Sequence, residues 1–251
     1  MLITSLDNDK IKKYVRLKEK KYRDQENQFI VEGMHLVLEA YRKGIIVELI
    51  LEQDEVCMLD SPKVYVSKEI IKKISTLETP VNIMALCNKI TPKTDIGSHL
   101  LLLDKIQDPG NLGTIIRSSK AFNVDTIILG DDSVDMYNPK VIRATQGIMF
   151  HINIINGDLR NIIPKLKEKE IPIYGTHVEF GEDIRNLRKK DKEKYALVMG
   201  NEGNGVSSDI LELCDTYLCI EMNHEVESLN VAIATSILLY ELSRWLDDYY
   251  R

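Results

Sequence analysis

The sequence lacks several features that would assign it to a common class of protein. Its 251 residues contain no apolar run near the roughly 20 residues that a membrane-spanning helix needs, so we expect no membrane span. The four cysteines form no CxxC pair, and the five histidines form no HExxH or His/Cys cluster. We therefore expect free thiols and no bound metal. The N-terminus has no apolar run after a basic start, which favours the cytoplasm over secretion.

Charge is distributed unevenly along an otherwise ordinary composition. The net charge of −6 argues against a protein coated in nucleic acid. Residues 1–92 nevertheless carry 15 basic and 14 acidic residues, whereas the remainder carries 18 and 25. One stretch holds eight cations beside a single acid, Glu19, and this basic patch consists of Lys10, Lys12, Lys13, Arg16, Lys18, Lys20, Lys21 and Arg23. The patch either contacts phosphates or is an ordinary solvated helix face.

Two segments meet near Ile90–Gly97, where KITPKTDIGS has the composition of a linker. The sequence therefore predicts two domains, residues 1–92 and 97–251. In the first, we expect a helix from about Asp7 to Lys20 and a helix over Met34–Lys43 that stops at Gly44. Strands are predicted at FIVEG, IIVELIL, KVYV and VNIMALC, with a helix over Lys68–Ser75. This is a small α/β domain.

The second segment alternates more regularly between apolar runs and helical stretches. The runs predict six strands: LLLLDKI, TIILG, HINII, PIYGTHV, YALVMG and TYLCIEM. Helices are expected over 112–122, 139–145, 159–169 and 208–214, and a long one over about Ser228–Trp245. This order indicates a mostly parallel sheet covered on both faces, with ligands beyond the carboxyl ends of its strands. In the last helix Leu229, Ile233, Ile237 and Tyr240 share one face, which we expect to be core.

The first strand end that carries candidate site residues is DKIQDPGNLGTIIRS, residues 104–118. Asn111 stands where a helix would begin, so it is either an N-cap or a site residue. Arg117 lies nearly two turns later among apolar residues, and a partly shielded arginine needs an anionic partner. The alternative is an ordinary arginine that reaches solvent.

Two further strand ends carry polar residues. LVMGNEGNGVSSDI contains Gly200, Gly203 and Gly205, a loop in which a ligand could approach backbone amides closely. Glu202 in that loop is a candidate partner for Arg117, or a solvated carboxylate. CIEMNHEVESLNVAIATSILL begins the final helix, where Ser228 suits an N-cap but Asn230 has no such structural role. No His or Asp is placed to activate Ser228 as a hydrolytic nucleophile.

Together the three segments resemble the motifs of the SpoU/TrmH family, a branch of the SPOUT RNA methyltransferases. The matching patterns are NxGxxxR, GNEGxG and SLNVAxA, in that order over about residues 98–245. RATQGIMFHI at 143–152 resembles a further family segment. Residues 1–90, with FIVEG, resemble the substrate-binding domain that many relatives carry. The resemblance implies an α/β fold in which a C-terminal trefoil knot ends a SPOUT domain.

The resemblance also implies a function: transfer of a methyl group from S-adenosylmethionine to a ribose 2′-hydroxyl of RNA, with rRNA favoured over tRNA. It implies a homodimer. The implied catalytic residues are Asn111, Arg117, Glu202, Ser228 and Asn230. The implied cofactor-binding residues are Gly200, Ile220, Met222 and Leu229. The basic patch would position RNA through its phosphates, by way of Lys10, Lys12, Lys13, Arg16, Lys20, Lys21 and Arg23.

The sequence departs from the family pattern at three positions: Glu221 stands for a proline, His224 for a glycine and Ala232 for a serine. Glu221 and His224 put the affinity for the methyl donor in doubt. One alternative function is therefore a catalytically silent RNA-binding relative that acts as a chaperone or assembly factor. A nucleotide-binding dehydrogenase would need GxGxxG after the first strand, and this chain lacks it.

Arg117 is often assigned as the general base in this family, but a guanidinium with a pKa above about 12 hardly gives up its proton. Our hypothesis is that Arg117 grips an RNA phosphate and stabilises negative charge developing on the 2′-oxygen. Glu202 and Asn111 would orient it.

Overall fold

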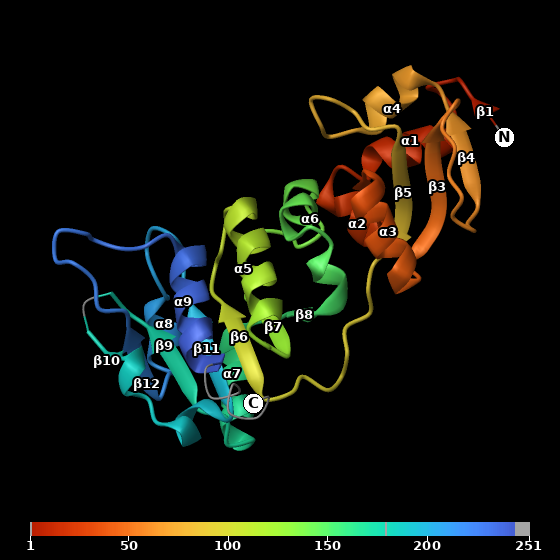
Figure 1. Ribbon diagram of the computed structural model, residues 1–251. Coiled ribbons are helices and arrows are strands. Elements are labelled where there is room, and N and C mark those ends of the chain that lie inside the picture. Colours follow the sequence, from red (N-terminus) through yellow and green to blue (C-terminus); the bar gives the residue numbers. More distant parts are fainter. Residues whose placement is uncertain (1, 179, 244–251) are drawn as a thin grey trace. The chain divides into compact units, whose positions relative to one another are not determined.

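A computed structural model describes residues 2–178 and 180–243 (Figure 1). The chain forms two compact units, each with its own core. Unit 1 comprises residues 1–91 and 135–150, and unit 2 comprises residues 92–134 and 151–251. Segment 135–150, which the sequence assigns to the second domain, therefore packs with the first.

Unit 1 is built on a five-stranded mixed sheet in the order β1-β4-β3-β5-β2. β1 and β3 run parallel to β4, and β5 runs antiparallel to β3 and β2. The elements are β1 (Leu2–Ile3), α1 (Asp9–Arg16), α2 (Lys20–Glu26), β2 (Gln28–Glu32), α3 (Met34–Lys43), β3 (Ile46–Glu52), β4 (Lys63–Val66), α4 (Lys68–Ile74), β5 (Ile83–Asn88), α6 (Pro139–Thr145) and the 3₁₀ turn η1 (Ile148–His151). The four strands predicted here are confirmed, and two-residue β1 was missed.

The helix predicted over Asp7–Lys20 is two helices, α1 and α2, because Glu19 between them is extended. Asn8 begins α1 by accepting a hydrogen bond from the amide of Lys10 at 2.9 Å. The break buries both Tyr14 of α1 and Arg23 of α2, which one straight helix would not do. The predicted stop of α3 at Gly44 is confirmed, with a positive φ of 72°.

Unit 2 contains a seven-stranded sheet in the order β10-β12-β9-β11-β6-β7-β8, with every neighbouring pair parallel. Its elements are β6 (His99–Leu103), α5 (Pro109–Ala121), β7 (Thr126–Leu129), β8 (Asn153–Asn156), α7 (Leu159–Glu168), β9 (Ile173–Thr176), β10 (Glu182–Asp183), η2 (Ile184–Asn186), η3 (Lys189–Lys192), β11 (Tyr195–Met199), α8 (Ser208–Leu211), β12 (Thr216–Cys219) and α9 (Val231–Ser243). The six predicted strands are confirmed; β10 has only two residues and no periodic signal.

The direction of winding reverses at the centre of this sheet. From β6 the chain adds β7 and β8 on one side, and then β9, β11 and β12 on the other. The switch point therefore lies between β6 and β11. In sheets of this kind the crevice at the carboxyl ends of the switch strands binds ligands. Here those ends are Leu103 and Met199, which are paired with each other.

The last helix buries a different face from the one predicted. Ile233 and Tyr240 are 53% and 51% exposed, whereas Leu238, Leu239 and Leu242 are buried. The prediction that Leu229, Ile233, Ile237 and Tyr240 form a core face is therefore wrong. α9 is apolar around most of its surface, so its sequence could not tell which side meets α5. Residues 244 and 245 of the predicted helix lie outside the described residues, and the trefoil knot stays a prediction.

Candidate functional site

The first site segment begins α5, and its cap is Asp108. The Asp108 carboxylate accepts a hydrogen bond from the amide of Asn111 at 2.7 Å, and Pro109 occupies the first helical position. The interpretation of Asn111 as the N-cap is therefore wrong. Because Asp108 satisfies the helix start, the Asn111 side chain is available for other contacts.

The Asn111 side chain joins two other predicted site residues. Its Nδ2 donates to Glu202 Oε1 at 3.0 Å, and its Oδ1 accepts from Asn230 Nδ2 at 3.0 Å. Glu202 also accepts from the Asp108 amide at 3.3 Å. Three loops that are far apart in sequence thus meet in one hydrogen-bonded chain, Glu202–Asn111–Asn230, which we call the amide bridge.

Asn230 is also the N-cap of α9. Its Oδ1 accepts from the amides of Ala232 at 2.9 Å and Ile233 at 3.3 Å. The sequence placed this cap at Ser228 and saw no structural role for Asn230; both expectations are wrong. One Asn230 side chain therefore fixes the helix start with its oxygen and the amide bridge with its nitrogen.

Arg117 lies on the outward side of α5 and is exposed. Within residues 2–178 and 180–243 it has no hydrogen bond or ion pair, since Glu202 is engaged by Asn111 instead. The expected shielding of Arg117 and its pairing with Glu202 are both wrong. The guanidinium is consequently available to an anion that the chain itself does not supply.

A cavity of about 580 Å³ opens beside the amide bridge. It lies at the ends of β9, β11 and β12, and is lined by the whole loop Gly200–Val206. The four predicted cofactor-binding residues all line it, as do two of the predicted catalytic residues: Gly200, Ile220, Met222, Leu229, Glu202 and Ser228. Its volume suits a small organic ligand.

The Gly-rich loop is folded tightly on itself. Asn201 and Gly205 exchange two backbone hydrogen bonds, at 2.9 and 3.0 Å. Gly205 has a φ of +67°, a conformation that glycine adopts with least strain. A Cβ on Gly200 would lie 2.0 Å from the Gly205 carbonyl carbon, so only glycine fits there. Position 200 thus requires glycine for a steric reason that the sequence pattern alone did not reveal.

One wall of the cavity was missed in the sequence. Thr176, the last residue of β9, lines it together with His177 and Val178, which follow the strand. β9 lies between β11 and β12 in the sheet, so its carboxyl end falls between the two loops already identified. The His177 ring stacks on Phe180 with 3.5 Å between centroids. Only the strand order reveals this wall, because nothing in the local pattern THVEF signals a ligand.

Cys219 lines the same cavity but is unsuited to covalent chemistry. Burial raises the pKa of its thiol, and the nearby carboxylates of Asp183 and Glu221 act in the same direction. The thiol therefore stays protonated near neutral pH, and a protonated thiol is a poor nucleophile.

The two unusual residues of the last motif lie outside the cavity lining. Glu221 accepts a hydrogen bond from the Arg185 guanidinium, which also pairs with Asp183. His224 is exposed. The charge of Glu221 is therefore compensated by Arg185 and does not point into the cavity.

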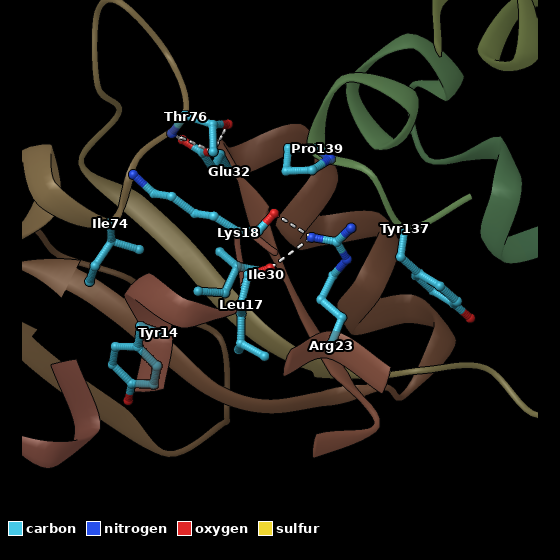
Figure 2. Close-up of a pocket in the computed structure, with 10 residues that line it drawn as sticks. All are labelled: Tyr14, Leu17, Lys18, Arg23, Ile30, Glu32, Ile74, Thr76, Tyr137 and Pro139. Carbon is cyan, nitrogen blue, oxygen red and sulfur yellow. Dashed lines mark hydrogen bonds between the residues drawn. The ribbon is translucent and has the colours of Figure 1, made fainter. Parts of the chain in front are cut away.

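Fewer cations of the predicted RNA-binding patch are available to RNA than the sequence suggested, and Arg23 is the clearest case. Arg23 is only 3% exposed, and its guanidinium donates to the carbonyl oxygens of Leu17 and Lys18 (Figure 2). The guanidinium also pairs with Asp135. Because the guanidinium nitrogens of Arg23 bond to groups inside unit 1, this side chain links the end of α1 to segment 135–150. Its assignment as an RNA-binding residue is withdrawn on this ground.

Most other cations of the patch have acidic partners. The pairs are Lys10–Glu48 at 2.7 Å, Lys12–Asp7 at 3.6 Å, Lys13–Glu26 at 2.8 Å and Lys20–Asp24 at 2.5 Å. Lys18 donates to two carbonyl oxygens at the end of α4. In the described part of the chain, only Arg16 and Lys21 of the patch form neither an ion pair nor a side-chain hydrogen bond, and both lie by the ring of Tyr22.

No helix among residues 2–178 and 180–243 is long and apolar enough to span a membrane. In the same part of the chain, no group of three or more His, Cys, Asp and Glu side chains could hold a metal ion.

A parallel α/β sheet with a Gly-rich ligand loop at its switch point defines a class of enzymes that bind a small cofactor. Comparison with known proteins narrows this class. Residues 98–240 match the SpoU rRNA methylase family, and residues 8–85 match the MRM3-like substrate-binding domain. The chain is 37% identical over 245 residues to the Bacillus subtilis 23S rRNA (guanosine(2553)-2′-O)-methyltransferase RlmP, covering 96% of this chain and 98% of that one. The chain therefore belongs to the SpoU rRNA methylase family.

Solved structures agree with this assignment. A Sinorhizobium meliloti rRNA methyltransferase crystallised with S-adenosylmethionine is 30% identical, with a TM-score of 0.86 and 98% coverage of both chains. An RNA 2′-O-ribose methyltransferase is 26% identical, with a TM-score of 0.82, covering 98% of this chain and 99% of that one. Both likenesses extend over the two units.

Proposed function

We propose that this protein methylates a ribose 2′-hydroxyl of ribosomal RNA, with S-adenosylmethionine as the methyl donor. The observation that carries the proposal is the cavity at the switch point, whose lining residue Glu202 is held by the amide bridge to Asn111 and Asn230. The B. subtilis relative, similar over nearly the whole chain, acts on a guanosine of 23S rRNA. An rRNA substrate is accordingly favoured over tRNA.

The residues of the cavity fit the donor. Gly200–Gly205 leave backbone groups accessible, and Ile220, Met222 and Leu229 offer apolar surface for a purine ring. Two carboxylates, Glu202 and Glu227, belong to the lining and suit a cationic ligand. Bound S-adenosylmethionine supplies an electrophilic methyl group on its sulfonium. The chain's own task is to bind, to orient and to manage charge on the acceptor.

On the acceptor side, the exposed and unpaired Arg117 is the group that meets RNA. Its planar guanidinium matches a phosphate in two-point contact, and it stabilises negative charge developing on the 2′-oxygen as the proton leaves. The amide bridge positions Glu202 and Asn111 at the cavity edge. The hypothesis that these two residues orient Arg117 is dropped, because neither contacts it.

A second copy of the chain would complete this site. Ile233 and Tyr240 leave an apolar face of α9 half exposed, and Tyr240 packs edge-on against Phe122, which directly follows α5, the helix of Arg117. Large apolar side chains gathered on one helix face are typical of an interface. We therefore propose a homodimer in the cytoplasm, where ribosomal RNA would be its substrate.

The alternative of a catalytically silent RNA-binding relative is less well supported. All five catalytic-type residues are present. Glu221 and His224, the two residues that put donor binding in doubt, lie outside the cavity lining, and Glu221 is paired with Arg185.

The deciding experiment is transfer of a tritiated methyl group from S-adenosylmethionine to unmodified rRNA, followed by nuclease mapping. We expect label in a single alkali-resistant dinucleotide, which identifies 2′-O-methylation and its position together. Donor binding without transfer to any rRNA or tRNA would favour the silent relative.

A further inference from the structure

The Gly-rich loop is held at both of its ends by one residue of the neighbouring strand. Asp104, directly after β6, donates its backbone amide to the carbonyl oxygen of Met199 at 2.9 Å, where the loop begins. Its carboxylate accepts from the amide of Ser207 at 2.7 Å and from the Ser207 hydroxyl at 2.6 Å, where the loop ends. Asp104 is 5% exposed. Asp104 thus ties together the two ends of the Gly-rich loop, at Met199 and Ser207.

At Ser207 the hydrogen bond to Asp104 is made in place of the usual cap of the following helix, α8. It occupies the N-cap position of α8, where a serine hydroxyl ordinarily accepts from a helix amide. Here its side chain makes no cap hydrogen bond: the hydroxyl donates to Asp104 and accepts from the ammonium of Lys105.

Lys105 reinforces the same closure. It has a φ of +56°, a left-handed conformation that is unfavourable for a residue with a side chain. In this conformation its carbonyl oxygen accepts from Asn201 Nδ2 at 2.9 Å, and its ammonium donates to Ser207 Oγ at 3.0 Å. A strained residue is retained where the surrounding contacts determine it. The ammonium also places a positive charge near the buried Asp104 carboxylate.

We propose that Asp104, acting through Ser207, is a positioning residue for methyl transfer: it holds the loop of residues 200–206 in the shape that binds the donor and presents Glu202. This inference rests on the proposed function. A carboxylate buried beside the cavity is favoured only when it is hydrogen-bonded, and its two bonds go to the end of this loop. Neither Asp104 nor Ser207 lines the cavity, so both act through the loop.

The test compares donor affinity among matched variants, measured by calorimetry below the melting temperature of each. Asp104→Ala removes both acceptor contacts, and we expect the Kd for S-adenosylmethionine to rise about tenfold or more. Asp104→Asn keeps one side-chain oxygen able to accept both bonds, and its Kd should stay within a few-fold of the wild type. Ser207→Ala removes only the hydroxyl, and should cost less affinity than Asp104→Ala.

The control is Asp125, at the opposite end of β6. One of its oxygens accepts from the amides of Ser98 and His99, both at 2.9 Å, so it makes the same kind of contact far from the cavity. Asp125→Ala should lower the melting temperature and leave donor affinity unchanged. The double variant Asp104→Ala/Ser207→Ala should bind no more weakly than Asp104→Ala alone.

Three results would overturn the inference while leaving the proposed function intact. They are unchanged donor affinity in both Asp104→Ala and Ser207→Ala, an equal loss in Asp125→Ala, or additive losses in the double variant. If the wild type itself binds no S-adenosylmethionine, the proposed function and this inference fail together.

Discussion

Arg117 and Asn111 lie on the same helix and are two turns apart, yet they have opposite environments. Asn111 is hydrogen-bonded on both sides, to Glu202 and to Asn230, so its orientation is fixed before any ligand arrives. Arg117 is exposed and has no partner in the described part of the chain. Preorganised groups suit the positioning of reactants, whereas an unpaired arginine suits the capture of an anion.

Arg117→Lys should lower kcat by about a hundredfold with saturating RNA, because an ammonium lacks the two-point geometry of a guanidinium. Donor affinity should not change, since Arg117 does not line the cavity. Single-turnover methylation and donor calorimetry on the same preparation separate the two effects. Nearly full turnover in the variant would contradict the role proposed for this residue.

At the scale of an element, the start of α9 combines the helix cap and the amide-bridge contact in one side chain, Asn230. Asn230→Asp should separate them. An aspartate still accepts from the amides of Ala232 and Ile233, so stability should be kept, but it has no amide hydrogen for Asn111. We expect a normal melting temperature with methyl transfer reduced about tenfold or more.

Asn230→Ala is the matched comparison, because it removes the cap as well as the bridge. It should destabilise the protein by about 1 kcal/mol in addition to losing activity. Equal activity in Asn230→Asp and the wild type would show that the amide bridge has no part in catalysis.

The Gly-rich loop allows a steric test with an internal control. A Cβ at Gly200 would meet the Gly205 carbonyl carbon at 2.0 Å, whereas a Cβ at Gly203 would have Asn201 Oδ1 as its nearest neighbour, at 3.6 Å. Gly200→Ala should therefore weaken donor binding by about tenfold to a hundredfold, and Gly203→Ala should leave it nearly unchanged. Donor calorimetry checks both, and similar Kd values for the two variants would contradict the tight loop geometry.

At the scale of the whole molecule, the two units are joined by three chain crossings, after residues 91, 134 and 150. Segment 135–150 contributes buried side chains to unit 1, and Tyr137 and Phe150 both pack on Phe29, with ring centroids 4.7 and 6.1 Å away. Arg23 adds its ion pair with Asp135. Unit 1 is therefore completed by chain from the middle of the sequence.

RNA binding through unit 1 should depend on Arg16 and Lys21, the two patch cations with neither an ion pair nor a side-chain hydrogen bond in the described part of the chain. Replacing both Arg16 and Lys21 by alanine should reduce the slope of log K against log salt by about 1.4 to 1.8, if each neutralises one phosphate. Lys20→Ala is the comparison, because Lys20 is paired with Asp24 and should change the slope less. Binding to an rRNA fragment across a salt series measures this, and an unchanged slope in the double variant would place RNA elsewhere.

Association of two copies should depend on the exposed face of α9. Ile233→Glu places a charge on that face, where a charge would be buried on association, and should convert a dimer to a monomer. Light scattering after gel filtration measures the mass. Tyr41→Glu, at an apolar residue of α3 that is 37% exposed, is the control and should leave the mass unchanged. A monomeric wild type would refute the proposed homodimer.

The sequence by itself determined the strands of unit 2, because near-continuous apolar runs between helices are typical of a covered parallel sheet. It also determined which residue types stand at the carboxyl ends of those strands, and hence the family. Gly44 and the six strands of unit 2 are confirmed on these grounds. Such signals depend only on residues that are close in sequence, so they do not require knowledge of the tertiary structure.

Only the tertiary structure decided which partners those residues have. Asp108 rather than Asn111 caps α5, Asn230 rather than Ser228 caps α9, and Glu202 meets Asn111 rather than Arg117. The wall after β9 follows from strand order, and the burial of Arg23 follows from the break between α1 and α2. Hydrogen bonds and ion pairs act over about 3 Å between groups far apart in sequence, so no local pattern can specify them.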